Sequence, residues 1–262
     1  MKIGDINFLK FLGGEEQNIL TTLVNLRQDF DVFSHLDSLY RAPFGLIDVP
    51  VGEELIPSLY LFVHFHLYFS VACLGRSHFS ECLASTRKAI DASLSAYEMI
   101  LDPSSQPLYE KRNNRFQFIK AHIARARKAD LSRYPLAVEL LELHNICSEF
   151  GSHADVSSFV HRVEMQNTGQ PGKSTLLFHY YQFPRDRHEY HIYFVETLLT
   201  FHQMLIIFQD FIASKAIGLQ VGWHEEIAKL GSVLEKERAA CYAFFAAKAK
   251  CGKYNVPRKL DR

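Results

Sequence analysis

Apolar residues recur every three to four positions along most of the chain, which is the pattern of α-helices that bury one face. Proline and glycine interrupt this pattern and mark the expected helix ends. The pattern predicts helices over residues 15–39, 53–74, 77–101, 107–129, 134–150, 186–216 and 223–250. Gly75 is expected to end the second helix, Ser77 to cap the third, and Gly151 to end the fifth in a left-handed conformation.

One segment, from about residue 157 to residue 183, departs from the helical pattern. Two runs rich in β-branched and aromatic residues, SSFVHRVEMQ and KSTLLFHYYQF, flank the turn-forming sequence NTGQPG. These features predict a β-hairpin, and its turn accounts for Gly169 and Gly172 without a nucleotide-binding loop. The expected fold class is therefore all-α: one domain over residues 1–262, built as a bundle of six to eight helices with one inserted hairpin.

Composition limits the kinds of protein that this chain can be. Its 262 residues are 48% hydrophobic, which is enough to build a core without disulfides or metals. Lys and Arg together number 29, as do Asp and Glu, so no overall charge attracts nucleic acid or a membrane. The five cysteines form no C-x-x-C pair and no secretory signal opens the chain, which predicts a cytoplasmic location. The most apolar run, residues 59–75, carries His64 and His66 and is interpreted as a buried helix, not a membrane span.

Thirteen histidines invite a search for metal ligands. No histidine has a glutamate three residues before it, so the sequence lacks the Glu-x-x-His pair of di-iron bundles. The zinc-protease pattern H-E-x-x-H is absent as well. We therefore expect neither a metal site nor a cofactor.

The polar stretch LHNICSEFGSHAD, residues 143–155, follows the apolar part of the fifth expected helix. One interpretation is structural, since serine and aspartate side chains after a glycine satisfy the backbone groups at a helix end. The other is functional, with His153 as a ligand-binding or acid–base group beside a cleft. Cys147 lies three residues after His144, but its place on the apolar helix face favours an inert core thiol over a nucleophile.

A basic segment precedes this stretch. Between Lys111 and Arg133 the chain has eight Lys or Arg residues and one acid, Asp130. A helix of this composition can contact the phosphates of RNA. The same composition also fits a solvated helix face whose charge is balanced elsewhere, so both interpretations stay open.

The order of helices over residues 59–155 resembles that of a group of prokaryotic HEPN-like helical proteins. An apolar helix is followed by HFSECLASTRKAIDASLSAYEMIL and then by a helix that ends in SEFGSHAD. The resemblance implies an arginine followed by an acid on the inner face of the middle helix, and Arg87 and Asp91 occupy such positions. It also implies a helical bundle that often pairs with a second copy of itself.

The first function that this resemblance implies is a binding or regulatory module of unknown ligand. Its cleft is expected to be lined by Arg87, Asp91, His144 and His153. An arginine and an acid on an apolar helix face are costly to bury unless they are paired or bound to a ligand, which supports this expectation.

The second function is a metal-independent ribonuclease of the toxin or phage-defence type. The pattern R-x4-6-H of such enzymes is matched by Arg115 with His122 and by Arg185 with His191. A histidine can accept the proton of an attacking 2′-hydroxyl, and an arginine can stabilise the charge that develops on the phosphate. The partners that the two hypotheses imply are RNA and a second copy of the chain, without a membrane.

Overall fold

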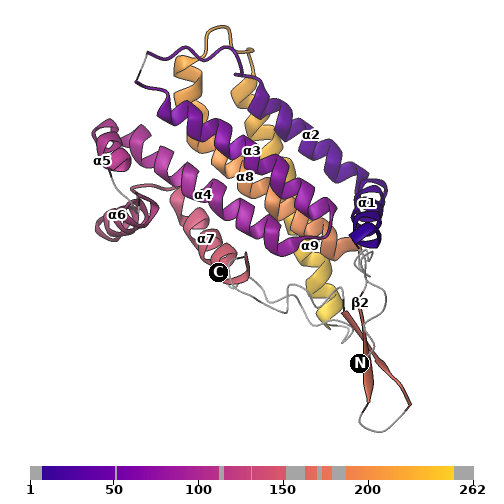
Figure 1. Ribbon diagram of the computed structural model, residues 1–262. Helices are drawn as coiled ribbons and strands as arrows, with labels where there is room; N and C mark the ends of the chain where they lie inside the picture. Colours follow the sequence, from indigo (N-terminus) through magenta and orange to yellow (C-terminus); the bar gives the residue numbers. More distant parts are fainter. Residues whose placement is uncertain are drawn as a thin grey trace.

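The chain forms a bundle of α-helices with one β-hairpin at its side (Figure 1). The computed structural model describes residues 8–50, 52–111, 115–130, 132–151, 163–169, 173–178 and 187–250. The helices of the bundle are α1 (Phe8–Asn25), α2 (Arg27–Arg41), α3 (Leu55–Gly75), α4 (Phe79–Leu101), α5 (Gln106–Lys111), α6 (Arg115–Ala129), α7 (Ala137–Gly151), α8 (Arg187–Lys215) and α9 (Trp223–Lys250). A short 3-10 turn, Pro103–Ser105, joins α4 to α5. This confirms the all-α fold with an inserted hairpin that the sequence predicted.

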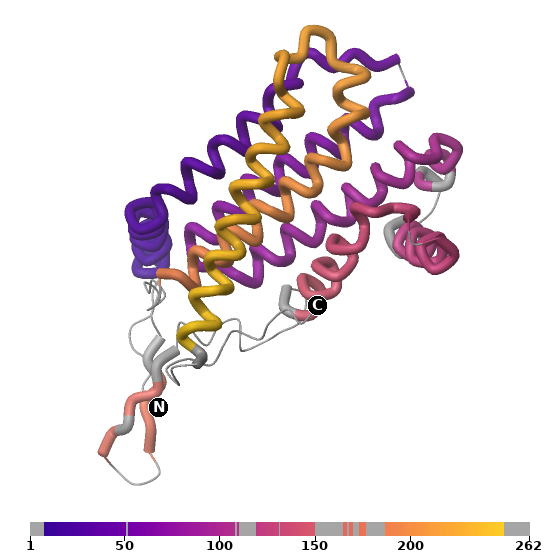
Figure 2. Tube along the Cα trace, turned by 180° about the vertical axis from the view of Figure 1, so that it is seen from behind, coloured from indigo at the N-terminus to yellow at the C-terminus, as the bar shows by residue number. Residues whose placement is uncertain are grey.

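Helix α8 is the centre of the bundle. It packs against α3 and α4 on one side and against α2 and α9 on the other (Figures 1 and 2). α7 lies along α4, and α6 also contacts α4, beyond the centre of the bundle. Most buried apolar residues of α2, α3, α4, α6, α7, α8 and α9 form one continuous core, and Ile192, Cys241 and Phe245 form a smaller cluster between α8 and α9.

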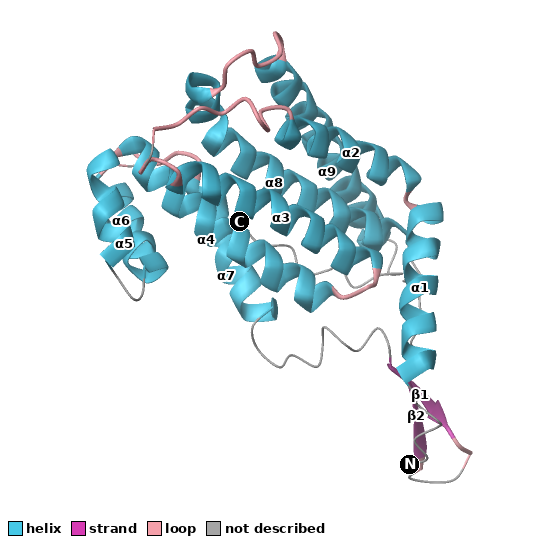
Figure 3. Ribbon diagram, turned by 45° about the horizontal axis from the view of Figure 1, so that its top comes forward, coloured by secondary structure: helices cyan, strands magenta, loops and turns pink. Residues whose placement is uncertain are grey.

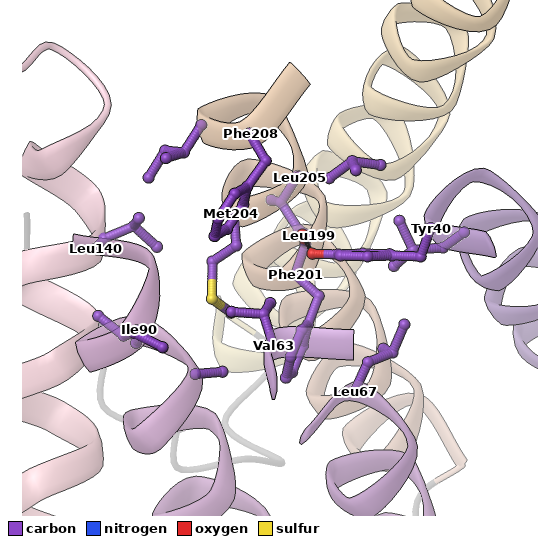
Figure 4. Packing of buried hydrophobic residues seen from close by; sticks show 14 of the residues in the cluster. Tyr40, Val63, Leu67, Ile90, Leu140, Leu199, Phe201, Met204, Leu205 and Phe208 are labelled. Carbon is purple, nitrogen blue, oxygen red and sulfur yellow. Dashed lines mark hydrogen bonds between the residues drawn. The ribbon is translucent and has the colours of Figure 1, made fainter. Parts of the chain in front are cut away.

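Aromatic side chains with polar tips connect the layers of this core (Figure 4). The Tyr40 hydroxyl of α2 donates to the Phe201 carbonyl of α8 at 2.6 Å. The Trp223 indole at the start of α9 donates to the Leu39 carbonyl at 3.0 Å. Buried tyrosine and tryptophan need such partners, because an unpaired polar group in a core is costly. These bonds fix α2 against α8 and α9.

The first predicted helix, residues 15–39, is two helices. The chain turns at Leu26, whose φ of −117° and ψ of 35° leave the helical region although its side chain is fully buried. The turn allows α1 to lie across the end of α3, where Asn18 and Thr22 donate to the carbonyls of Arg76 and Gly75. Two orphan carbonyls of α3 are thus satisfied by side chains of α1. The predicted fourth helix is divided too, into α5 and α6.

The link between α3 and α4 corrects two other expectations. Ser77 does not cap α4; it takes the left-handed conformation, with φ of 61°, that closes α3. The amides of Ser77 and His78 donate to the carbonyls of Leu74 and Cys73, as in a Schellman motif. Likewise Gly151 is the last helical residue of α7 and not a left-handed cap.

The hairpin lies inside the predicted segment. β1 (Val163–Asn167) pairs antiparallel with β2 (Ser174–Phe178), in a register that sets Val163 opposite Phe178. Gly169 in the connection has φ of 73°, which a hairpin turn uses and other residues rarely adopt. The strands project from the end of the bundle near α1 (Figures 1 and 3).

Two helices, α3 and α8, are long and apolar enough to cross a membrane by length and composition, a test that the core helix of a soluble protein also passes. α8 is mostly buried among the other helices, whereas only half of the apolar window of α3 is buried. The interpretation of residues 59–75 as a buried helix therefore holds for one face of α3 only. Its other face is open to solvent.

Candidate functional site

Four charged or titratable side chains meet where α4, α6 and α7 pack together. Arg87 and Asp91 lie one turn apart on α4, Lys120 comes from α6 and His144 from α7. His144 is at the centre of the group, and its side chain is only 4% exposed. The sequence placed Arg87, Asp91 and His144 in one cleft, and the structure brings these three together.

Both ring nitrogens of His144 face a cation. Arg87 Nε donates to Nε2 at 3.4 Å, and Lys120 Nζ lies 3.2 Å from Nδ1. Asp91 Oδ1 is 3.0 Å from Nε2 but accepts no directed hydrogen bond from a described residue. A neutral imidazole accepts at one nitrogen and donates at the other. His144 therefore cannot accept from Arg87 and Lys120 at the same time.

Positive charge exceeds negative charge at this site. Across the described segments, neither Arg87 nor Lys120 has a carboxylate oxygen within 4 Å. Lys120 Nζ donates instead to the amide oxygen of Asn145 at 2.8 Å. Burial lowers the pKa of Lys120, the Arg87 charge lowers it further, and Asp91 opposes the shift. The Lys120 ammonium thus lies beside His144 and Asn145 and is partly removed from water.

Cys147 and Ser148 lie beside His144 on α7 but are not placed as nucleophiles. The Cys147 side chain is almost fully buried, and burial raises its thiol pKa to about 12. A thiol with this pKa stays protonated at neutral pH and reacts slowly. The Ser148 hydroxyl donates to the His144 carbonyl at 2.6 Å. The burial and the raised thiol pKa of Cys147 agree with its interpretation as an inert core thiol. The Ser148 hydroxyl is engaged by the backbone of its own helix.

The Arg115 and His122 pair is only half described. Arg115 is the first residue of α6, and its side chain is outside the described part of the structure. His122 Nε2 lies 3.2 Å from Glu98 Oε1 on α4. Glu98 is buried and its other oxygen accepts from the Tyr134 hydroxyl. His122 is therefore held by a carboxylate of α4, away from His144.

His191 of α8 lies between α2 and α9, and none of these helices contributes to the His144 cluster. Its predicted companion, Arg185, is outside the described residues. Its Nδ1 is 2.5 Å from Asp29 Oδ1, and its Nε2 is 3.6 Å from Glu237 Oε2. Hydrogen bonds to Asp29 and to the Cys241 thiol, with the Asp29 charge, raise the pKa of His191 to about 10. A histidine that is protonated at neutral pH is not available as a base, so the ribonuclease role predicted for His191 is physically unfavourable.

His153, the remaining predicted ligand residue, also lies outside the described residues. Lys120 is the site residue that the sequence analysis did not select. The sequence feature that could have identified Lys120 is the basic segment around α6. Its basic residues have different roles in the structure. Lys120 enters the site, while Arg127 donates to the carbonyls of Arg133 and Tyr134 and so orders the α6–α7 connection.

Among the described side chains, no group of three or more His, Cys, Asp or Glu is arranged to hold a metal ion. Comparison with known proteins found no matching family model, no similar curated protein and no similar solved structure. The chemistry of the site therefore rests on its own geometry.

Proposed function

We propose that the protein is a binding or regulatory module of the HEPN-like kind, whose site between α4, α6 and α7 takes an anionic group. One observation carries the proposal: Arg87 and Lys120 approach opposite nitrogens of a single buried histidine. Because an imidazole ring accepts a hydrogen bond at no more than one nitrogen, His144 cannot be the acceptor for both of them. A phosphoryl or carboxylate oxygen between the two cations supplies that acceptor and balances the charge.

The setting of Lys120 supports the same ligand chemistry. Its lowered pKa reflects an ammonium that has lost water near Arg87, and the charge of Asp91 offsets only part of that loss. An anion beside it recovers that lost solvation energy, so binding should be strongest where Lys120 is charged. Asn145, the other partner of Lys120, is exposed, which places this side of the cluster at the protein surface. A phosphate of an RNA backbone is one group that fits these requirements.

Isothermal titration calorimetry with inorganic phosphate and with a short single-stranded RNA tests the proposal. Arg87→Met and Lys120→Met should each weaken binding by about tenfold or more, because each removes a charge-assisted hydrogen bond of about 1.5–3 kcal/mol. Lys88→Met is the matched control, since Lys88 is exposed on α4 next to Arg87 and does not contact His144. Absence of binding to both probes, or an equal loss in Lys88→Met, would contradict the proposal.

The alternative is a metal-independent ribonuclease, and one observation favours it. His144 lies within hydrogen-bonding distance of Arg87 and Lys120, so an imidazole and two cations are present in one place. These groups are what 2′-hydroxyl attack on the adjacent phosphate requires. In the ribonuclease, His144 would be the base, the role for which the R-x4-6-H pattern suggested His122 and His191.

Incubation of the purified protein with total RNA in EDTA separates the two functions. Cleavage by the wild type and by His122→Ala, but not by His144→Ala, would establish the enzyme. RNA that binds and stays intact would establish the binding module. The Lys88→Met protein again serves as the control for nonspecific loss of charge.

A further inference from the structure

Asp91 is the acidic member of the cluster between α4, α6 and α7. Its Oδ1 atom lies 3.0 Å from His144 Nε2, yet this buried atom receives no directed hydrogen bond from a described residue. The side chain as a whole is 30% exposed, so the carboxylate also borders the open side of the cluster. A buried oxygen without a donor is costly, and a carboxylate can accept several hydrogen bonds. Asp91 is therefore an acceptor in need of a donor.

The two cations of the cluster do not supply that donor. Arg87 Nε is directed at His144, and Lys120 Nζ donates to Asn145. In the part of the chain that the structure describes, Asp91 pairs with neither cation within 4 Å. Burial lowers the pKa of Lys120, and the Asp91 charge offsets part of that shift from a longer distance. The site thus presents donors and an acceptor that do not satisfy one another.

A ligand that suits both kinds of group needs oxygens that accept hydrogen bonds and a hydrogen that donates one. An oxyanion beside a carboxylate is repelled unless a proton lies between the two oxygens. Hydrogen phosphate keeps such a proton at neutral pH. Sulfate has the same charge and the same tetrahedral shape but no proton, and an internal phosphodiester has no proton either. The carboxylate therefore distinguishes anions that two cations alone would treat alike.

We propose that Asp91 makes the site selective for a phosphate that carries a proton, either free hydrogen phosphate or a terminal phosphate, over sulfate and over an internal phosphodiester. This inference rests on the proposed function, since it takes the anion site of Arg87 and Lys120 as given and names the class of anion. The P–OH group donates to the Asp91 carboxylate, while the other phosphate oxygens accept from the two cations. A terminal phosphate has a second pKa of about 6, so it also retains this proton in part near neutrality.

Isothermal titration calorimetry of the full chain with sodium phosphate and with sodium sulfate tests the selectivity. The wild type should bind sulfate about tenfold to hundredfold more weakly, because sulfate forms no charge-assisted bond with Asp91 and sets two acceptors against each other. Asp91→Asn should bind sulfate more tightly than the wild type does and should bind both anions within about threefold of each other, since an amide can donate to either.

Glu142→Gln is the matched control. Glu142 is exposed on α7, and its substitution changes the net charge by the same amount as Asp91→Asn. This variant should keep the wild-type preference for phosphate. A preference lost equally in both variants would assign the selectivity to net charge and overturn the role of Asp91.

Two oligonucleotides of one sequence, with a 5′-phosphate and with a 5′-hydroxyl, separate the two sources of phosphate. Tighter binding of the phosphorylated strand by the wild type, but not by Asp91→Asn, would identify a terminal phosphate. Equal binding of the two strands, with phosphate still preferred over sulfate, would identify free hydrogen phosphate.

The comparison of phosphate with sulfate on the wild type needs no variant, so it decides the matter even if Asp91→Asn does not fold. Equal affinity for the two anions would overturn the selectivity and leave the anion site in place. Binding of neither anion would instead remove the proposed function itself. A preference for phosphate that survives in a folded Asp91→Asn protein, checked by circular dichroism, would also overturn the inference.

Discussion

His191 is surrounded by Asp29, Glu237 and Cys241, and this environment converts a histidine that the sequence offered as a base into a structural cation. Three helices, α2, α8 and α9, contribute to the group. A buried carboxylate such as Asp29 is tolerated in the core because the imidazolium pairs with it. The same residue type thus has two environments in this protein: the ring of His144 lies between Arg87 and Lys120, and His191 is a cation between acids.

The His191 ion pair makes stability depend on pH. Because the folded pKa of about 10 lies above the unfolded value of about 6.5, the pair stabilises the protein fully below pH 6.5 and is lost as pH rises through 10. Urea unfolding at pH 6, 8 and 10 should show the difference in unfolding free energy between the wild type and His191→Gln shrinking as pH rises. At pH 6 we expect the variant to lose about 2–3 kcal/mol. A difference that is constant with pH would show that His191 is not charged in the folded protein.

The residues of the proposed binding site were predictable to different degrees. Arg87 and Asp91 were selected because the resemblance implies an arginine and an acid on the inner face of an apolar helix, where these two lie one turn apart. His144 was selected because it lies in the polar stretch 143–155 at the end of the fifth predicted helix. Lys120 was not, because its role depends on how α6 lies against α7 after the chain leaves α5. Sequence periodicity describes one helix at a time and does not give the angle between two short ones.

At the scale of elements, the long helices α3, α4, α8 and α9 were predicted to within about two residues, which is the accuracy with which helix ends are defined at all. The break at Leu26 was missed, because an apolar residue at a helical spacing gives no sign of a turn. That turn is stabilised by tertiary contacts, namely the bonds from Asn18 and Thr22 to the end of α3. The carbonyls that accept these bonds lie 53 and 58 residues later in the chain and so leave no mark on the local pattern.

The contact between α8 and α9 supplies a test at this scale. A Cβ atom on Gly231 of α9 would lie 2.5 Å from His202 Cε1 of α8, and His202 is held by a 2.7 Å hydrogen bond from its Nε2 to the Ile227 carbonyl. Gly231→Ala should therefore destabilise the protein by about 1–3 kcal/mol, although alanine is the better helix former by about 1 kcal/mol.

The matched substitution is Gly13→Ala in α1, where an added Cβ meets no atom within 4 Å. It should leave stability unchanged or raise it by up to about 1 kcal/mol. Thermal unfolding followed by circular dichroism compares the two variants. Equal stabilisation by the two substitutions would show that α8 and α9 do not approach each other closely at Gly231.

At the scale of the whole molecule, the hairpin is an addition to the bundle. Within the described segments, β1 and β2 pair mainly with each other, and their ends meet because Val163 lies opposite Phe178. Replacing residues 163–178 with a short glycine–serine linker should shift the Tm by no more than about 2 °C, since none of the hairpin side chains whose burial is described belongs to the core. The variant should also keep the phosphate binding of the wild type. A large loss of Tm would show that the hairpin supports the helices.

The bonds from α2 to the last two helices decide when this protein can fold. Tyr40 and Phe201 are separated by 161 positions, and Leu39 and Trp223 by 184. During synthesis the N-terminal third leaves the ribosome long before its partners in α8 and α9 exist. The nascent chain therefore carries the apolar sides of α1, α2 and α3 unprotected until α8 and α9 have been translated, and folding requires contacts of high sequence separation. A fragment that stops before α8 should be a substrate for chaperones and not a smaller version of the bundle.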